Sequence, residues 1–220
     1  MPKVLIVAAT QNEIQPLLKI FKIDVSGAEG LFESNSEPNL FVLITGVGMV
    51  NTAYYLGRYS HNLYDIVINV GICGSFNKNI KIGEVVNVVT DTFSEMGAED
   101  GKEFIKYVDL NLGGNALFNN QVTIDFTSLN ALKNVNGITV NTIHGNEESI
   151  QKTTKLFNAD VESMEGAAFF KGCHRLSENY FQIRAVSNYV EKRDKSKWDI
   201  PLAINNLNNF VTTLLKELIK

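Results

Sequence analysis

The segment Tyr64-Asp65-Ile66-Val67-Ile68-Asn69-Val70-Gly71 is an apolar, largely β-branched run that leads directly into Ile72-Cys73-Gly74-Ser75. A continuous apolar run of this length is typical of a strand that is covered on both faces, as in parallel sheets. The runs at residues 3–9 and 39–45 have the same character. The sequence therefore predicts three buried strands in the first third of the chain.

Segments with helical spacing alternate with these strands. Apolar residues recur every three or four positions over 13–21, and 50–59 is also expected to be helical. The other expected strands are 84–93, 137–143 and 180–186, and the other expected helices are 147–157, 164–176 and 201–220. This alternation predicts an α/β fold: one domain over residues 1–220, with a twisted, mostly parallel or mixed central sheet flanked by helices. Residues 94–135, rich in Asn and Gly, are expected to form irregular excursions.

Composition excludes several classes of protein. Of 220 residues, 45% are hydrophobic and 20% charged, which allows a sizeable core and argues against disorder. Lys+Arg 20 against Asp+Glu 24 gives a formal charge of −4, and this mildly acidic balance argues against a nucleic-acid partner. No run approaches the ~20 apolar residues of a membrane span. Cys73 and Cys173 show no CxxC spacing, so we expect core thiols, a reducing compartment and a cytoplasmic protein without membrane partners.

Familiar cofactor and metal motifs are incomplete. Gly46-Val47-Gly48-Met49-Val50-Asn51 lacks the third glycine of a dinucleotide site, and 97–102 is too short for a phosphate-binding loop of the Walker type. His61, His144 and His174 have no partners at the spacing of metal ligands. The sequence predicts neither a cofactor nor a metal.

Polar residues of interest follow the expected strands. In α/β sheets, ligands bind at the carboxyl ends of the strands, and Glu13, Glu165 and Asn188 all lie just after or near such ends. Glu13 has two interpretations: a carboxylate that complements a helix dipole, or a general base at the mouth of the sheet. Glu165 stands in Val161-Glu162-Ser163-Met164-Glu165-Gly166, where small residues would allow a tightly packed helix start.

Together these residues resemble the nucleoside phosphorylase and nucleosidase superfamily over almost the full chain. The similar blocks occur in the order of that superfamily: 4–13, 45–52, 69–75, 82–90, 143–150, 160–168 and 184–191. Within the superfamily, the chain is most similar to the futalosine hydrolase branch, on the motifs at 95–100, 144–147, 162–170 and 187–194. This resemblance implies release of hypoxanthine and dehypoxanthine futalosine from futalosine, in menaquinone biosynthesis. It also implies a small-molecule nucleoside substrate and a homodimer or higher homo-oligomer, with a neighbouring subunit completing the pocket.

The resemblance assigns roles residue by residue. Glu13 corresponds to the carboxylate that activates water, Glu165 to the one that binds the ribose hydroxyls, and Asn188 to the residue at N7 of the purine. The remaining residues line the substrate: Met164 against the sugar, Ile72, Cys73 and Gly74 beside the base and the water, and the backbone of Glu148 and Ser149 along the purine.

Asn188 carries a prediction about the base. Relatives that cleave adenine nucleosides have Asp at this place, whereas an Asn amide offers NH₂ to the O6 and N7 acceptors of a 6-oxo purine. The absence of Arg or Lys from 46–51 and 71–75 favours water over phosphate as the attacking group, with Arg58 a weak candidate for a phosphate site. The alternatives are a methylthioadenosine/S-adenosylhomocysteine-type nucleosidase, a 6-oxo purine nucleoside phosphorylase and a non-catalytic nucleoside-binding protein.

Arg193 is the candidate cation for the carboxylate at the far end of futalosine. It is equally well interpreted as a solvated Arg in a charge-rich loop with Lys192, Lys195 and Lys197.

Overall fold

A mixed β-sheet forms the centre of the molecule. The computed structural model describes residues 1–173 and 175–219, and within them nine strands form this sheet. The strands are β1 (Val4–Ala8), β2 (Gly30–Glu33), β3 (Leu40–Ile44), β4 (Ile66–Ser75), β5 (Val85–Phe93), β8 (Leu117–Asn119), β9 (Lys133–Thr139), β10 (Val161–Ser163) and β11 (Tyr180–Tyr189). Every residue of β1 is buried, as its apolar sequence predicts.

The strand pairing curls part of the sheet back on itself. β1 runs parallel to both β3 and β4, and β11 runs parallel to β4 on its other side. β5 is antiparallel to β11 and parallel to β9, which is parallel to β10. β10 then pairs antiparallel with β4 through Val161 and Glu162, so five strands close a ring. The predicted α/β fold with a mixed central sheet is confirmed.

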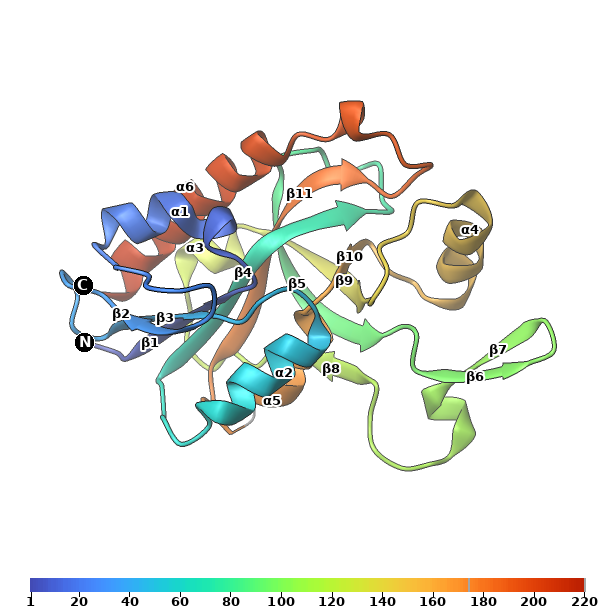
Figure 1. The fold of residues 1–220 in the computed structure, drawn as a ribbon, viewed down its shortest axis with the longest axis horizontal. Helices are drawn as coiled ribbons and strands as arrows, with labels where there is room; N and C mark the ends of the chain where they lie inside the picture. The colour runs from blue at the N-terminus through green and yellow to red at the C-terminus, as the bar shows by residue number, and fades with distance from the viewer. Residues whose placement is uncertain (174, 220) are drawn as a thin grey trace.

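Helices cover both faces of the sheet, as Figure 1 shows. On one face, α1 (Gln11–Ile20), α3 (Thr127–Asn130) and α6 (Ile200–Leu218) bury side chains such as Leu17, Leu207 and Val211. On the other, α2 (Met49–Arg58) and α5 (Gly166–Cys173) bury Leu56 and Phe169. Each fully buried side chain of this size stabilises the fold by roughly 1.5–3 kcal/mol before entropy is counted. α4 (Glu147–Leu156) lies to the side of the sheet.

Polar caps place the helix starts. Thr10 and Glu13 form a capping box at α1, and the Asn146 side chain accepts hydrogen bonds from two backbone N–H groups of α4. Asp199 caps α6 in the same way, with Pro201 in the first turn where its missing N–H costs nothing. These local signals are the reason that the helix starts follow the sequence closely.

Several boundaries differ from the prediction. β4 continues to Ser75 instead of ending at Gly71, because both β11 and β10 pair with its last residues. β9 begins at Lys133 and ends at Thr139, where 137–143 was expected, and α5 begins two residues later than expected. The segment 94–135 holds, besides β8 and α3, a projecting hairpin of β6 (Gly97–Asp100) and β7 (Glu103–Lys106) and a 3-10 turn at Tyr107–Leu110. The strands of this hairpin, like β2 and β10, have only three or four residues. Segments this short show no clear hydrophobic pattern in the sequence, so they were not predicted.

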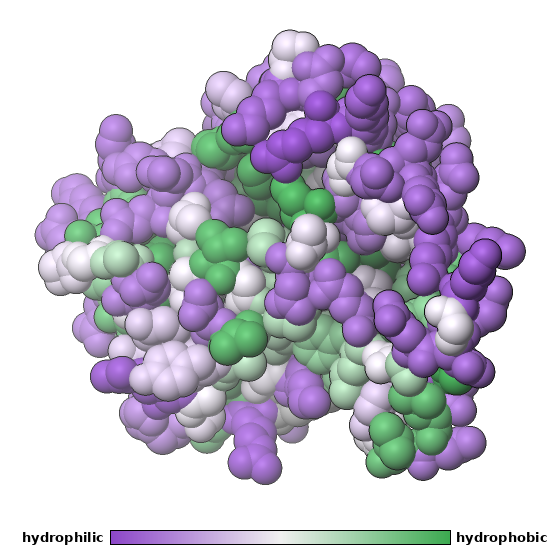
Figure 2. All heavy atoms as spheres, turned by 45° about the vertical axis from the view of Figure 1, so that its right-hand side comes forward, coloured by the Kyte–Doolittle hydropathy of each residue, from purple (hydrophilic) through white to green (hydrophobic). Residues whose placement is uncertain are grey.

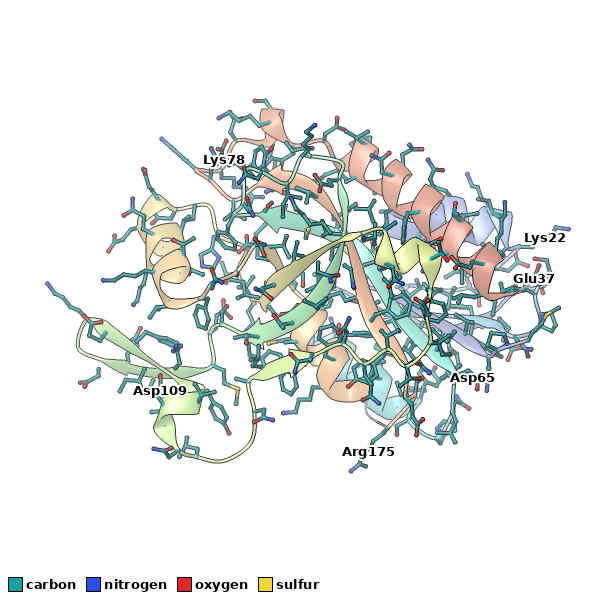
Figure 3. All side chains as sticks on the ribbon, turned by 180° about the vertical axis from the view of Figure 1, so that it is seen from behind. Lys22, Glu37, Asp65, Lys78, Asp109 and Arg175 are labelled. Atoms are coloured by element: carbon teal, nitrogen blue, oxygen red, sulfur yellow. The ribbon has the colours of Figure 1, made fainter. Side chains whose placement is uncertain are left out.

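Charged side chains of both signs are spread around the periphery. Figure 3 labels Lys22, Glu37 and Asp65 towards one end and Lys78, Asp109 and Arg175 elsewhere on the outline. None of the helices in the described part of the chain is both long and apolar enough to cross a bilayer.

Candidate active site

A cavity of about 330 Å³ lies where β1, β4, β10 and β11 end. Figure 2 turns the corresponding side of the molecule forward and shows apolar side chains in a hollow that hydrophilic residues frame. The lining residues are Ala9, Thr10, Asn12, Glu13, Val47, Ile72, Cys73, Gly74, Ile143, Glu162, Ser163, Met164, Glu165, Ser187, Asn188, Trp198, Ile200 and Ile204. A mostly apolar cavity of this size with a few converging polar groups is typical of a small-molecule site.

Glu13 is both a helix cap and a cavity carboxylate, so its two interpretations are compatible. Its Oε2 accepts hydrogen bonds from the backbone N–H and the hydroxyl of Thr10, at 3.1 and 2.9 Å. Its Oε1 accepts one from the backbone N–H of Ile72 in the cavity wall, at 3.2 Å. Burial, and then the nearby Glu165 carboxylate, raise the pKa of Glu13 above its ordinary value. Such a carboxyl is suited to proton transfer nearer neutral pH.

Glu165 is held in the turn between β10 and α5. Its Oε1 accepts a hydrogen bond from the backbone N–H of Gly48 at 3.0 Å, and its Oε2 lies 3.4 Å from Arg184 Nη1. Gly48 has a φ of 100°, a conformation that glycine adopts readily. The carboxylate is therefore fixed from two sides and available to bind neutral hydroxyl groups by charge-assisted hydrogen bonds.

Asn188 reaches the cavity through an irregularity in β11. The pairing of β11 with β4 shifts register between Val186 and Asn188, and such bulges re-aim side chains. The Asn188 Oδ1 accepts a hydrogen bond from the Ser187 hydroxyl at 2.8 Å, and Nδ2 donates to the Tyr189 carbonyl at 3.0 Å. The amide orientation follows from these partners, and the second N–H of Nδ2 remains for a ligand.

The other predicted residues divide into two groups. Met164, Ile72, Cys73 and Gly74 all line the cavity together with Glu13, Glu165 and Asn188. Burial raises the pKa of the Cys73 thiol to about 12, so the thiol remains neutral. It therefore forms part of the cavity wall and does not act as a nucleophile.

The structure does not bring Glu148, Ser149 or Arg193 into the cavity wall. The backbone N–H groups of Glu148 and Ser149 donate to the Asn146 side chain, as the cap of α4. Arg193 is exposed, and its guanidinium lies 5.0 Å from the ring of Trp198, which does line the cavity. Arg193 is thus one residue removed from the cavity.

Three further residues of this region had not been predicted from the sequence. Arg184 is almost fully buried against Glu165, and its sequence signal is a cation inside a buried strand. Trp198 arrives from the segment before α6, and nothing local marks it. Glu162 lines the cavity and pairs with His144, whose Nδ1 lies 2.5 Å from its Oε2.

No cluster of three metal-ligating side chains occurs among residues 1–173 and 175–219. His174, one of the histidines considered above, lies outside the described residues.

Comparisons with known proteins find similar sequences and similar folds. A futalosine hydrolase of Thermus thermophilus is 29% identical over 181 residues, which cover 80% of this chain and 80% of that relative. The solved futalosine hydrolase of Helicobacter pylori superposes with a TM-score of 0.79 at 15% identity, covering 97% of both chains. A 5′-methylthioadenosine/S-adenosylhomocysteine nucleosidase from Neisseria meningitidis superposes with a TM-score of 0.78 at 20% identity, covering 97% of this chain and 98% of that one.

At these identities the two solved structures show a shared fold. The family model described as the phosphorylase superfamily matches residues 3–220, which is nearly the whole sequence. The chain therefore belongs to the phosphorylase superfamily.

Proposed function

We propose that this protein is a futalosine hydrolase, which cleaves the N-glycosidic bond of futalosine with water and releases hypoxanthine and dehypoxanthine futalosine. The observation that carries the proposal is the convergence of Glu13, Glu165 and Asn188 on one cavity. The similarity to the Thermus thermophilus enzyme supports the choice of substrate, and with it a role in menaquinone biosynthesis.

The chemistry requires a base for water and support for a cationic sugar. Glu13 is the carboxylate with the raised pKa, so it is the group we assign to take the proton from the attacking water. Glu165, held by Gly48 and Arg184, is assigned to the two ribose hydroxyls, with Met164 against the sugar. Two carboxylates near the sugar also stabilise positive charge as the bond to the base breaks.

Asn188 is assigned to the leaving base. Its free amide N–H can donate to the O6 and N7 edge of hypoxanthine, which presents only acceptors. Adenine presents a donor at position 6, which would oppose the amide donor. The Asn188 amide therefore favours a 6-oxo purine over adenine.

Water is favoured over phosphate because the described cavity lining contains no Lys or Arg. Arg184, behind the wall, is already bonded to Glu165, Gln182 and Asn69. Arg58 donates to Tyr54 on α2, outside the cavity lining. A phosphate co-substrate would require cations that point into the cavity.

Arg193 remains our candidate for the carboxylate at the far end of futalosine. Its support is its position over Trp198 at the edge of the cavity. We retain the Glu148 and Ser149 backbone as a further candidate contact with the purine, one that would require α4 to lie closer to the cavity.

A homodimer is the assembly we propose for the active protein. The face of α2 and the loop before it exposes Val47, Val50 and Tyr54 at 48%, 74% and 57%. Exposed apolar side chains that cluster in this way mark interaction sites, and a two-fold pair is the commonest assembly.

We further propose that residues 1–220 act as one domain in the cytoplasm, where the buried thiols Cys73 and Cys173 remain free.

One assay separates the candidate functions. The protein is incubated with futalosine, inosine and 5′-methylthioadenosine, with and without phosphate, and base release is followed by chromatography. We expect hypoxanthine from futalosine without phosphate. Adenine release from methylthioadenosine as the main activity would support the alternative nucleosidase, and a requirement for phosphate would support a phosphorylase. Failure to cleave any of the three, with binding retained, would leave a nucleoside-binding protein.

A further inference from the structure

A chain of buried polar side chains runs behind the cavity, away from the substrate side. Arg184 is its centre and is 1% exposed. Its Nε donates to Gln182 Oε1 at 2.8 Å, and its Nη2 donates to Asn69 Oδ1 at 2.5 Å. Its Nη1 faces Glu165 Oε2 at 3.4 Å. The guanidinium is thus held on three sides, and only one of its partners is a cavity residue.

Asp91 on β5 ends this chain. Gln182 Nε2 donates to Asp91 Oδ2 at 3.1 Å, and Asp91 Oδ1 accepts from the Thr139 hydroxyl at 2.8 Å. A guanidinium only donates and a carboxylate only accepts, so the Gln182 amide can bridge them in one orientation alone. Asp91 is therefore connected to Glu165 through Gln182 and Arg184, without touching the cavity.

Two glycines leave the space that this chain occupies. A Cβ on Gly166, next to Glu165, would contact Asp91 Oδ2 and lie 2.5 Å from Gln182 Oε1. A Cβ on Gly71 would contact Arg184 Nη1 and lie 2.9 Å from Glu13 Oε1. The backbone of β4 and the start of α5 are thus packed directly against the polar chain, which limits its movement.

The charges around the chain are few. Glu13 faces Glu165 and Arg184. Asp91 faces Arg184 and the neutral thiol of Cys73, which Glu162 also faces. Burial raises the pKa of Asp91 to about 6, so Asp91 carries its charge at neutral pH. One guanidinium thus serves three carboxyl groups. If Arg184 acted on Glu13 and Glu165 alone, its full charge would lower the pKa of Glu13 and weaken it as a base.

We propose that Asp91 is a positioning residue for the cavity carboxylates: through Gln182 it fixes the Arg184 guanidinium and takes up part of its charge. Asp91 thereby keeps Glu13 a stronger base than it would be beside a free guanidinium. The consequence for catalysis rests on the proposed function, whereas the electrostatic link does not.

The test replaces the charge and keeps the shape. In Asp91→Asn, the new amide oxygen can accept from Gln182 as before, and the new NH₂ can donate to the Thr139 hydroxyl, which in the wild type donates to Asp91. We expect the titration midpoint of the Glu13 carboxyl, followed by ¹³C NMR in the free protein and assigned with Glu13→Gln, to fall by about one pH unit. With futalosine as substrate, the acid limb of the pH profile of kcat/KM should shift to lower pH by the same amount. The value of kcat should fall several-fold, with little change in KM.

Asp160→Asn is the matched control, because it also removes one carboxylate charge. Asp160 bonds to Asn77 and to the backbone of Asn136, not to Arg184. We expect no shift of the Glu13 midpoint in this variant.

Gln182→Met is the second variant and applies if Asp91→Asn does not fold. It removes the amide that joins Asp91 to Arg184 and keeps the Asp91 carboxyl group, so we expect the Glu13 midpoint to fall here too. A folded Asp91→Asn or Gln182→Met protein with an unmoved Glu13 midpoint would overturn the proposal. Absence of futalosine cleavage by the wild-type protein would defeat the proposed function, and the NMR titration would still decide the role of Asp91.

Discussion

The carboxylate of Glu13 caps α1 with one oxygen and contacts the cavity wall with the other. A Gln at this third helical position can still close the capping box, so Glu13→Gln should fold. We expect turnover of futalosine to fall by about 10²–10⁴-fold, because a general base is lost, with substrate binding largely retained. Steady-state kinetics and calorimetric titration measure the two effects. Retention of more than about half of the wild-type rate would remove Glu13 from the role of base.

The raised pKa of Glu13 predicts a pH dependence. A general base acts as the carboxylate, so activity is lost as pH falls through its pKa. Because burial raises that pKa above its ordinary 4.5, the acid limb of kcat/KM should lie above 4.5. A rate profile from pH 4 to 9 on futalosine measures it, with a pH-independent reporter of folding as the control. An acid limb at or below the ordinary value would contradict the assignment.

Asn188 predicts the choice of base. In Asn188→Asp, the N–H that we assign to the purine is replaced by an acceptor that repels O6. We compare kcat/KM for a hypoxanthine nucleoside with kcat/KM for the adenine nucleoside that has the same 5′ group. We expect this ratio to fall roughly 30-fold, which corresponds to about 2 kcal/mol. Competition assays with the paired nucleosides give this ratio directly. Equal rates on both nucleosides in the wild-type protein would show that Asn188 does not select the base.

At the scale of elements, the start of α5 depends on a glycine. In Gly166→Ala the new methyl group would meet Asp91 and Gln182 in the buried polar chain. We expect the free energy of unfolding to fall by about 1–3 kcal/mol, as in other overpacked cores. Urea denaturation followed by circular dichroism measures the loss.

Gly57→Ala in α2 is the matched control for this substitution. Nothing lies within 4 Å of the position that its Cβ would take. An alanine in a helix restricts the unfolded chain, so we expect a gain of about 0.5–1 kcal/mol. Equal effects of the two substitutions would mean that packing at Gly166 is looser than the geometry indicates.

At the scale of the whole molecule, the exposed face of α2 predicts self-association. Val50 is 74% exposed, and a charge at its position would be buried in a dimer formed there. We expect the wild-type protein to sediment as a dimer and Val50→Glu as a monomer with unchanged circular dichroism. Lys19→Glu, on an exposed part of α1, is the control. A wild-type monomer at working concentration would rule out the dimer.

The sequence by itself determined the elements that depend on near neighbours. The apolar run of β4 and the helical spacing of α1 and α6 are local features, so these elements were predicted within a few residues. The placement of Glu13 and Glu165 after strands followed from the same reasoning, since an α/β topology brings strand ends together. Asn188 was expected after a strand that ends at residue 186, but it lies within β11, next to the irregularity in that strand.

Only the tertiary structure decided the features that depend on distant pairs. The closure of the sheet by β10 on β4 joins residues that are far apart in sequence, and so does the chain from Asp91 through Arg184 to Glu165. Trp198 enters the cavity wall, while Glu148, Ser149 and Arg193 stay outside it, because the loops around the sheet fold according to contacts that no local pattern encodes. Local propensity selects helices and strands, but long-range packing decides which buried polar groups find one another.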